Sequence, residues 1–389
     1  MTDPRALNDA GMQALKAGDA REAARLFSDA ANADPKASPL WLNLANAHRQ
    51  LGDDAGERAA LQRAIDNDQL DFIAQVRMAQ LSERTGDAAD AHYRWGGVIQ
   101  MATQLPPSPQ LDDLLTHARH FVQQRAETLA NALDTALGDW RATVSPDSAR
   151  RTGVAIDRLV GRRQIYHSEP SGLHYPFLPA DEYFDRNHFP WLAELEAATN
   201  DIRAEYLALM AARPSSVEPY VNQDAGTPEN KWSVLDKTTD WGAAFLYRYG
   251  KRREEVLAQC PRTAALLEKL PLAHVPGRGP TAFFSILEPQ AHIPPHTGVS
   301  NIRSICHLPL IVPEDCGFRV GGETRQWREG EAWVFDDTIE HEAWNRSDRP
   351  RAILIIDVWN PYLRAEEREM IARFLTAADE AGFGPAAHD

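Results

Sequence analysis

The stretch TAFFSILEPQAHIPPHTGVSNIRSICHLPLIV, residues 281–312, decides the fold of the C-terminal half of the chain. Short runs rich in Phe, Ile and Leu alternate there with Pro, Gly and Asn, a pattern typical of β-strands joined by turns. Further candidate strands follow at short intervals: GFRVGG, ETRQW, EAWVFDD, HEAWN and RAILIIDVW. Strands of this length and spacing predict a sandwich or barrel, such as a double-stranded β-helix of the jelly-roll type.

The first hundred residues contain a repeat. Gly-Asp pairs occur at residues 18–19, 52–53 and 86–87, each 34 residues after the one before. Small residues precede the pairs and large apolar residues follow them, again in steps of 34: Gly11, Ala45 and Ala79, then Phe27, Leu61 and Trp95. The pattern predicts helix–turn–helix units that resemble the tetratricopeptide repeat. Such an array either presents a surface to a peptide or protein or packs only against its own chain.

Composition changes divide the rest of the chain. Residues 1–103 are interpreted as the repeats, and PPSPQ at residues 106–110 interrupts them. Helical periodicity resumes from Leu111, so residues 104–150 are expected to form capping helices and a linker. Residues 151–389 become rich in aromatic residues and proline and then in strands. The predicted fold class is multidomain α + β, with an N-terminal α-helical repeat array followed by a double-stranded β-helix domain.

Charge and cysteine usage exclude several classes of protein. Lys and Arg number 41 against 56 Asp and Glu, a formal charge of −15. Nucleic acids and anionic membranes repel such a surface, so neither is expected as a partner. The three cysteines lack CxxC spacing and predict no disulfide framework. The N-terminus has no apolar signal core, and the most apolar run is too short to span a bilayer. We therefore expect a cytoplasmic chain.

Two histidines of the strand region are candidate metal ligands. His296 and His341 lie 45 residues apart, on strands that a barrel would bring together. Mononuclear iron sites usually add a carboxylate two residues after the first histidine, but that position is Gly298. Asp336 and Asp337, shortly before His341, offer carboxylates, although their place in a turn suits them better to stabilising the turn or orienting a histidine.

An arginine ten residues after the second histidine is a candidate anion ligand. Arg351 opens the apolar strand RAILIIDVW. A guanidinium among apolar neighbours is suited to holding a carboxylate by two parallel hydrogen bonds. The alternative is a salt bridge from Arg351 to Asp348 or Asp357.

The runs HTGVSNIRSICHLPLIV, EAWVFDDTIEHEAWN and RAILIIDVWNP, with WGAAFLYRYG upstream, resemble the aspartyl/asparaginyl β-hydroxylase family over roughly residues 155–365. That family uses His-Thr-Gly, without the carboxylate, and binds iron(II) through two histidines with 2-oxoglutarate as cosubstrate. The resemblance implies that His296 and His341 are the catalytic metal ligands. It also implies a set of residues that bind the cosubstrate: Ser285, His307, Arg351 and, more loosely, Trp241.

One position departs from the family pattern. The animal enzymes have an arginine two residues before the histidine that corresponds to His307, where this chain has Ile305. Arg303 falls on the same face of the strand. We therefore expect Arg303 to reach the cosubstrate in place of the missing arginine.

The resemblance implies an iron(II)- and 2-oxoglutarate-dependent dioxygenase that hydroxylates an Asp- or Asn-like residue of a peptide or protein. The repeats would then dock this substrate. Three alternatives stay open. The missing carboxylate leaves room for a halide, as in a halogenase; the substrate could be a small molecule or a lipid acyl chain; and Ile305 is compatible with an inactive repeat scaffold.

Overall fold

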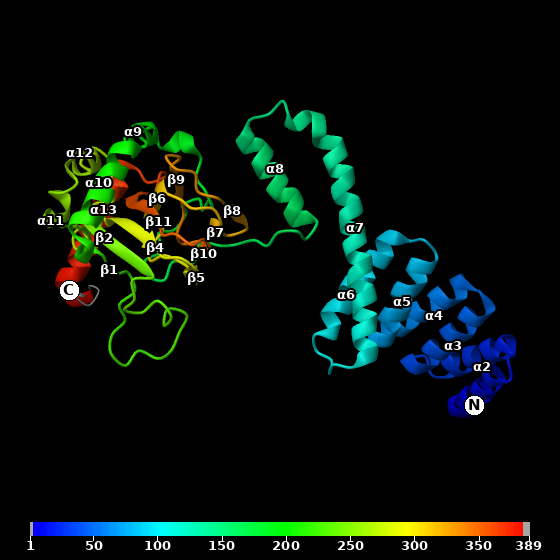
Figure 1. Ribbon diagram of the computed structural model, residues 1–389. Helices are drawn as coiled ribbons and strands as arrows, with labels where there is room; N and C mark the ends of the chain where they lie inside the picture. Colours follow the sequence, from blue (N-terminus) through cyan, green and yellow to red (C-terminus); the bar gives the residue numbers. More distant parts are fainter. Residues whose placement is uncertain (1–2, 384–389) are drawn as a thin grey trace. The chain divides into compact units, whose positions relative to one another are not determined.

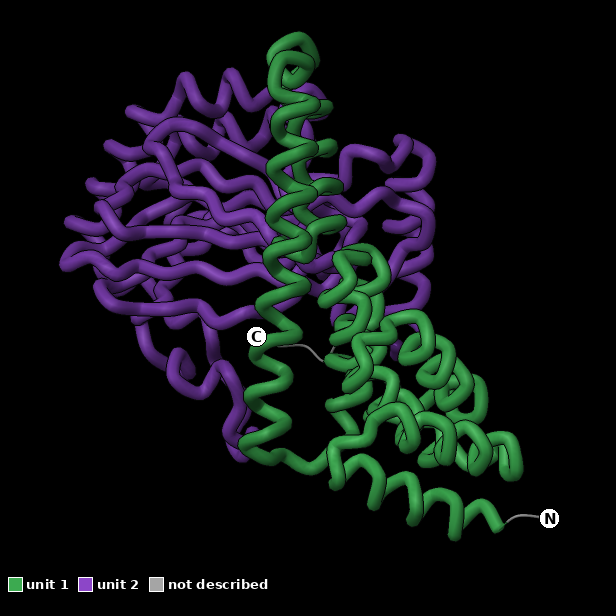
Figure 2. The backbone as a smooth tube through the Cα atoms, turned by 90° about the vertical axis from the view of Figure 1, so that its right-hand side faces the viewer, with its two compact units in different colours: residues 1–162 green, residues 163–389 purple. Residues whose placement is uncertain are grey.

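The computed structural model describes residues 3–383 of the chain (Figure 1). The chain divides into two compact units, residues 1–162 and residues 163–389, coloured separately in Figure 2. Helix α8 (Pro146–Leu159) belongs to the first unit. The change of composition near residue 151 therefore falls inside a helix, eight residues or so before it ends. The sequence placed the domain boundary at residue 151, whereas the two compact units divide after residue 162.

The described part of the first unit is helical. Its other helices are α1 (Pro4–Lys16), α2 (Ala20–Ala33), α3 (Ser38–Leu51), α4 (Asp54–Asn67), α5 (Phe72–Arg84), α6 (Ala88–Ala102) and α7 (Pro109–Arg141). α1 packs on α2, α3 on α4 and α5 on α6, each pair contacts the next, and α7 packs on α6. This confirms the predicted helical repeat array. Among residues 3–383, no helix is both long enough and apolar enough to cross a lipid bilayer.

The Gly-Asp pairs form the turn inside each repeat. Gly18, Gly52 and Gly86 have positive φ, between +69° and +82°, the left-handed conformation in which glycine is favoured. The side chain of the aspartate that follows each glycine accepts a hydrogen bond from the backbone N–H three residues later. This bond caps the next helix. One dipeptide therefore ends one helix and begins the next, which explains its exact recurrence in the sequence.

Small residues allow the paired helices to approach closely. Gly11 of α1 lies against the ring of Phe27 in α2, and a Cβ on Gly11 would come within 2.6 Å of a ring carbon. Phe27, Leu61 and Trp95 are fully buried. The large residues that recur every 34 positions in the sequence are thus buried between the helices in the structure.

Replacing Gly11 with Ala should destabilise the array. Overlap with Phe27 costs about 1–3 kcal/mol, which exceeds the gain of roughly 1 kcal/mol in helix propensity. Gly96→Ala is a matched control in α6, where a Cβ meets nothing within 4 Å, and it should stabilise the chain. Urea unfolding of the full chain, followed by circular dichroism, compares the two midpoints. A Gly11→Ala midpoint at or above that of the control would contradict the packing.

Two antiparallel sheets form the centre of the second unit. The larger sheet has the order β1-β2-β4-β11-β6-β9, with β3 paired to β2, and the smaller has the order β5-β10-β7-β8. The strands are β1 (Glu218–Pro219), β2 (Trp241–Arg248), β3 (Lys251–Arg252), β4 (Ala282–Leu287), β5 (His292–His296), β6 (Arg303–Ile311), β7 (Cys316–Val320), β8 (Glu323–Arg325), β9 (Trp333–Phe335), β10 (His341–Asn345) and β11 (Arg351–Trp359). Every pairing is antiparallel.

The two sheets share one core. Its buried side chains come from both of them, among others Leu287, Ile305 and Ile353 from the larger sheet and Ile293 and Phe318 from the smaller. The other face of the larger sheet packs against α9 (Leu192–Ala197), α10 (Thr199–Ala212), α11 (Glu254–Leu257) and α12 (Pro261–Leu267) (Figure 1). α13 (Ala365–Ala378) follows the last strand. This two-sheet sandwich confirms the predicted β-domain, and its inner face carries the candidate site.

Candidate active site

His296 and His341 meet on neighbouring strands of the smaller sheet. His296 ends β5 and His341 begins β10, and the antiparallel register pairs the two residues directly. Their ring centroids lie 4.0 Å apart. The structure thus brings together the two candidate ligands that are remote in sequence.

Backbone carbonyls orient both rings. Nδ1 of His296 lies 2.8 Å from the carbonyl oxygen of Pro294, and Nδ1 of His341 lies 3.0 Å from that of Ile339. Because a carbonyl oxygen only accepts, each Nδ1 carries the hydrogen and each Nε2 keeps a free lone pair. Burial lowers the pKa of His296 to about 4 and the pKa of His341 well below its usual value. Both rings are therefore neutral at neutral pH, the form that binds a metal.

Asp336 stabilises the turn before the second histidine. Its Oδ1 accepts hydrogen bonds from the backbone N–H of Thr338 at 3.0 Å and from the Thr338 hydroxyl at 2.5 Å. The carboxylate is 1% exposed, and burial raises its pKa. Asp336 thus makes the turn contact that its position in the sequence predicts.

The side chain of Asp337 occupies the space beside Gly298. A Cβ on Gly298 would overlap the Asp337 carboxylate, and the Gly298 N–H donates to the Asp337 carbonyl oxygen. Oδ1 of Asp337 is buried without a hydrogen-bond partner, and burial raises the pKa of this carboxyl group to about 7. Across residues 3–383, no group of three or more His, Cys, Asp or Glu side chains is arranged to hold a metal. The candidate metal site therefore offers two histidines.

Replacing Gly298 with Ala should lower the free energy of unfolding by about 1–3 kcal/mol, because the added methyl overlaps Asp337 in a packed interior. The cost should disappear in an Asp337→Ala background, where the overlapping carboxylate is gone. Urea unfolding of the wild type, both single variants and the double variant measures this coupling. Equal costs in the two backgrounds would show that the two residues do not compete for space.

Arg351 is a buried cation that has no carboxylate partner among residues 3–383. It begins β11 and is 1% exposed. Its Nη1 donates to the carbonyl and hydroxyl oxygens of Ser285, both at 3.2 Å, whereas its Nε is buried with no partner. The alternative partners, Asp348 and Asp357, contact other arginines. Burial lowers the pKa of Arg351 to about 10, so the group stays charged at neutral pH. A buried charge is costly unless an anion pairs with it.

Ser285 is oriented by two donors. The indole N–H of Trp241 donates to Ser285 Oγ at 3.1 Å, and Arg351 donates to the same atom. Because these bonds use both lone pairs of the hydroxyl oxygen, its hydrogen is left to donate elsewhere. The three predicted residues therefore form one cluster of hydrogen-bond donors, which suits a carboxylate.

His307 is buried on β6, and Arg351 and His341 both act electrostatically on its ring. The indole N–H of Trp327 lies 3.4 Å from His307 Nδ1, and the Arg351 guanidinium lies 4.8 Å above the Trp327 ring. Two phenylalanines contact the rings of both His307 and His341: Phe318 and Phe335. Burial, reinforced by the charge of Arg351, lowers the pKa of His307 well below its usual value. His307 is therefore neutral, with Nε2–H available as a donor.

Arg303 has a carboxylate partner within its own chain. Its Nη1 lies 2.9 Å from Oδ2 of Asp357, whose side chain is 4% exposed. This charge keeps the pKa of Arg303 above its usual value. Ile305, two residues along the same face of β6, is buried in the core between the sheets. The assignment of Arg303 to the cosubstrate therefore stays a prediction.

Aromatic rings cover His296 on its outer side. Trp232 approaches His296 edge-on with ring centroids 4.9 Å apart, and Trp241 lies 6.3 Å from the same ring. Tyr220 stacks on Trp241 at 3.8 Å. The sequence did not single out Trp232 or Tyr220, because they lie in segments without a clear strand or helix pattern. Trp327 closed the candidate strand ETRQW, but the structure ends that strand at Arg325, so the pattern did not predict the direction of the Trp327 side chain. The frequency of aromatic residues in these segments was the available signal.

Known proteins match the second unit across this site. Residues 196–361 match the family model described as Aspartyl/Asparaginyl beta-hydroxylase. The chain is 36% identical to the ornithine lipid ester-linked acyl 2-hydroxylase of Rhizobium tropici, over 50% of this chain and 66% of that protein. It is 40% identical to the aspartyl/asparaginyl beta-hydroxylase of Homo sapiens, over 35% of this chain and 18% of that protein. The chain thus spans under two thirds of the length of these relatives.

The first unit has weaker matches among solved structures. The first TPR of Spaghetti (RPAP3) bound to HSP90 peptide SRMEEVD aligns with 18% identity and a TM-score of 0.27, over 30% of this chain and 91% of that one. The family assignment rests on the second unit, where the matched residues include both histidines, Ser285, His307 and Arg351. Through this unit, the chain is similar to the aspartyl/asparaginyl β-hydroxylase family.

Proposed function

We propose that the second unit is an iron(II)- and 2-oxoglutarate-dependent hydroxylase. The observation that carries this proposal is Arg351, a buried guanidinium whose Nε has no partner among residues 3–383, in the same domain as two neutral histidines with free Nε2 atoms. The Arg351 charge also acts on His307, and the rings of His307 and His341 share contacts with Phe318 and Phe335. A keto acid with a second carboxylate would pair with the guanidinium at one end and bind a metal at the other. Iron, 2-oxoglutarate and O2 would supply the chemistry: oxidative decarboxylation to succinate coupled to insertion of one oxygen atom into a C–H bond.

The chain's own residues would hold and shield these groups. His296 and His341 would bind the metal through Nε2. Arg351 and the Ser285 hydroxyl would bind the distal carboxylate of the cosubstrate, and the neutral His307 would donate from Nε2. Trp232 would keep water away from the outer side of His296.

The first candidate substrate is an Asp- or Asn-like residue of a peptide or protein. The name of the human relative supports it, as does the helical repeat array, because such arrays present extended surfaces to partners. We propose that the array docks this substrate.

The second candidate substrate is a molecule in which the hydroxylated carbon lies in an apolar group, such as a methylene of a lipid acyl chain. The groups near the histidines favour it: Arg303 is already paired with Asp357, and Trp232 and Trp241 place apolar rings against His296. Apolar walls bind hydrocarbon without an ionic partner. The name of the Rhizobium tropici relative points in the same direction.

Coupled turnover tests the proposal. The purified full chain, iron(II) and 2-oxoglutarate are incubated in air with a pool of Asp- and Asn-containing peptides or with a lipid extract. Succinate release together with a mass gain of one oxygen atom in one pool supports hydroxylation and identifies the substrate class. A chlorine gain that depends on added chloride would instead show a halogenase. No consumption of 2-oxoglutarate with either pool, in protein that binds neither metal nor 2-oxoglutarate, would identify an inactive scaffold.

A further inference from the structure

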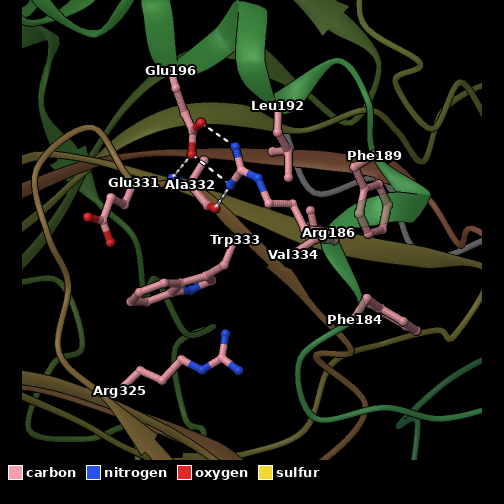
Figure 3. A pocket seen from close by; sticks show the side chains of 10 residues that line it. All are labelled: Phe184, Arg186, Phe189, Leu192, Glu196, Arg325, Glu331, Ala332, Trp333 and Val334. Atoms are coloured by element: carbon pink, nitrogen blue, oxygen red, sulfur yellow. Dashed lines mark hydrogen bonds and ion pairs between the residues drawn. The ribbon is translucent and has the colours of Figure 1, made fainter. Parts of the chain in front are cut away.

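A second cavity lies outside the candidate active site, between α9 and the edge strand β9 (Figure 3). It encloses about 350 Å³, within the range of small-molecule sites, which combine apolar walls with a few polar groups. Its lining residues are Phe184, Arg186, Phe189, Leu192, Glu196, Arg325, Glu331, Ala332, Trp333 and Val334. None of them contributes a group to the cluster around Arg351 and the two histidines.

The acceptors on one wall of the cavity already have partners. Both carboxylate oxygens of Glu196 pair with the guanidinium of Arg186, and one also accepts from the Ala332 N–H at 2.8 Å. The carbonyl oxygen of Ala332 accepts from Arg186, and that of Val334 accepts from the Phe184 N–H at 3.0 Å. Figure 3 shows the bonds among Glu196, Arg186 and Ala332. Few acceptors on this wall are therefore free to bind a ligand.

The opposite wall carries donors without acceptors. The indole N–H of Trp333 is buried and has no hydrogen-bond partner. Arg325 uses its Nε on Glu323 at 2.6 Å, and within residues 3–383 its two terminal nitrogens donate no hydrogen bond. The ring of Tyr183 lies 3.7 Å from the Arg325 guanidinium carbon and holds the group in place. Figure 3 shows Trp333 and Arg325 next to each other, with Phe184 and Phe189 on the far side of the cavity.

The unpaired N–H groups of this wall favour a ligand rich in acceptor atoms. Arg325 pairs with Glu323 through its Nε, which leaves the two terminal nitrogens to bind such a ligand. Glu331 is the one lining carboxylate whose oxygens are not held by the cavity wall; it is largely exposed and lies 3.7 Å from Arg328. Its charge is therefore screened by water and by that arginine. Arg325, by contrast, faces the cavity with an N–H pair of the geometry that binds a carboxylate bidentately.

We propose that this cavity binds a small carboxylate with an apolar body. The carboxylate accepts hydrogen bonds from the terminal nitrogens of Arg325 and from the indole of Trp333. The body contacts Phe184, Phe189 and Leu192. The site is distinct from the one at Arg351, because Trp333 stacks on Trp327 at 6.3 Å and 13°, and these two indoles separate the cavity from the Arg351 guanidinium.

Calorimetric titration of the full chain with phenylacetate tests the assignment. Phenylacetamide, which has the same shape without the charge, is the control ligand. We expect saturable binding of phenylacetate and at least tenfold weaker binding of phenylacetamide. Arg325→Gln should weaken phenylacetate binding about tenfold or more. Arg328→Gln is the matched control at the rim and should change it little, because that side chain is 77% exposed and does not line the cavity.

Two further variants keep the test decisive. Arg325→Lys retains the cation and the contact with Tyr183 but loses the planar pair of N–H donors, so it should bind phenylacetate with intermediate affinity. This variant keeps the test informative even if the glutamine variant folds poorly. Arg351→Gln should bind phenylacetate like the wild type. Absence of binding to the wild type, equal binding of the amide, or loss of binding in Arg351→Gln would each overturn the proposal.

Discussion

We expect His341→Ala to abolish both the metal binding and the turnover proposed for the second unit. Loss of one of two histidine ligands leaves a single imidazole to hold the ion, and we expect metal-dependent activity to fall by roughly a thousandfold or more. Isothermal titration with Mn2+, which is stable in air, measures the loss of metal affinity without requiring a substrate. His296→Ala should behave in the same way, because the two rings lie on paired residues 4.0 Å apart.

A third histidine provides the control. His292 lies on the same strand as His296, but it is exposed and bonds to Glu342 at 2.9 Å. His292→Ala should therefore retain wild-type affinity for Mn2+. If the three variants bound Mn2+ equally well, the metal would lie elsewhere; circular dichroism separates this outcome from unfolding.

Arg351→Met should abolish binding of 2-oxoglutarate while leaving metal binding intact. Truncating one partner of a buried charge pair costs about 2–5 kcal/mol, or roughly 30- to several-thousandfold in affinity. The thermal stabilisation that 2-oxoglutarate gives the wild type by mass action should be lost as well. Arg349→Met is the control, because that side chain is exposed on the turn before β11.

For Arg351→Met we also expect a gain in thermal stability when 2-oxoglutarate is absent. Without 2-oxoglutarate, the wild type holds an unpaired charge in its interior, so Arg351→Met should unfold at a higher temperature than the wild type in the absence of ligand. Differential scanning calorimetry with and without 2-oxoglutarate measures both effects. A variant that is less stable and still responds to 2-oxoglutarate would show that Arg351 serves the fold and not the ligand.

Local patterns in the sequence predicted much of the fold. The Gly-Asp turns depend on one left-handed residue and one cap, and both can be identified from a dipeptide that recurs. The meeting of His296 and His341 follows from strands that pair in register, and the turn contact of Asp336 follows from its position. These features depend on near neighbours or on regular pairing, so the sequence contains the necessary information.

Other contacts depend on tertiary structure. The sequence predicted that Arg303 reaches the cosubstrate and offered Asp357 only as a partner of Arg351, whereas the pairing of β6 with β11 brings Arg303 to Asp357. Trp327 approaches Arg351 from a segment between two short strands, where no periodicity fixes its direction. Asp337 fills the space left by Gly298 from 39 residues away. Irregular segments place side chains through contacts that single-sequence patterns do not encode.

The carbonyl contacts of the two ligand rings have a thermodynamic consequence. Since both imidazoles are held by their own backbones before any ion arrives, capture of the ion removes little additional rotational freedom from them. In the proposed hydroxylase the pair would act as a preformed chelator, in contrast to zinc fingers, which order only when loaded. Removing the ion from such a site should leave the sandwich folded, so that the proposed activity would be lost and restored by exchange of the ion alone.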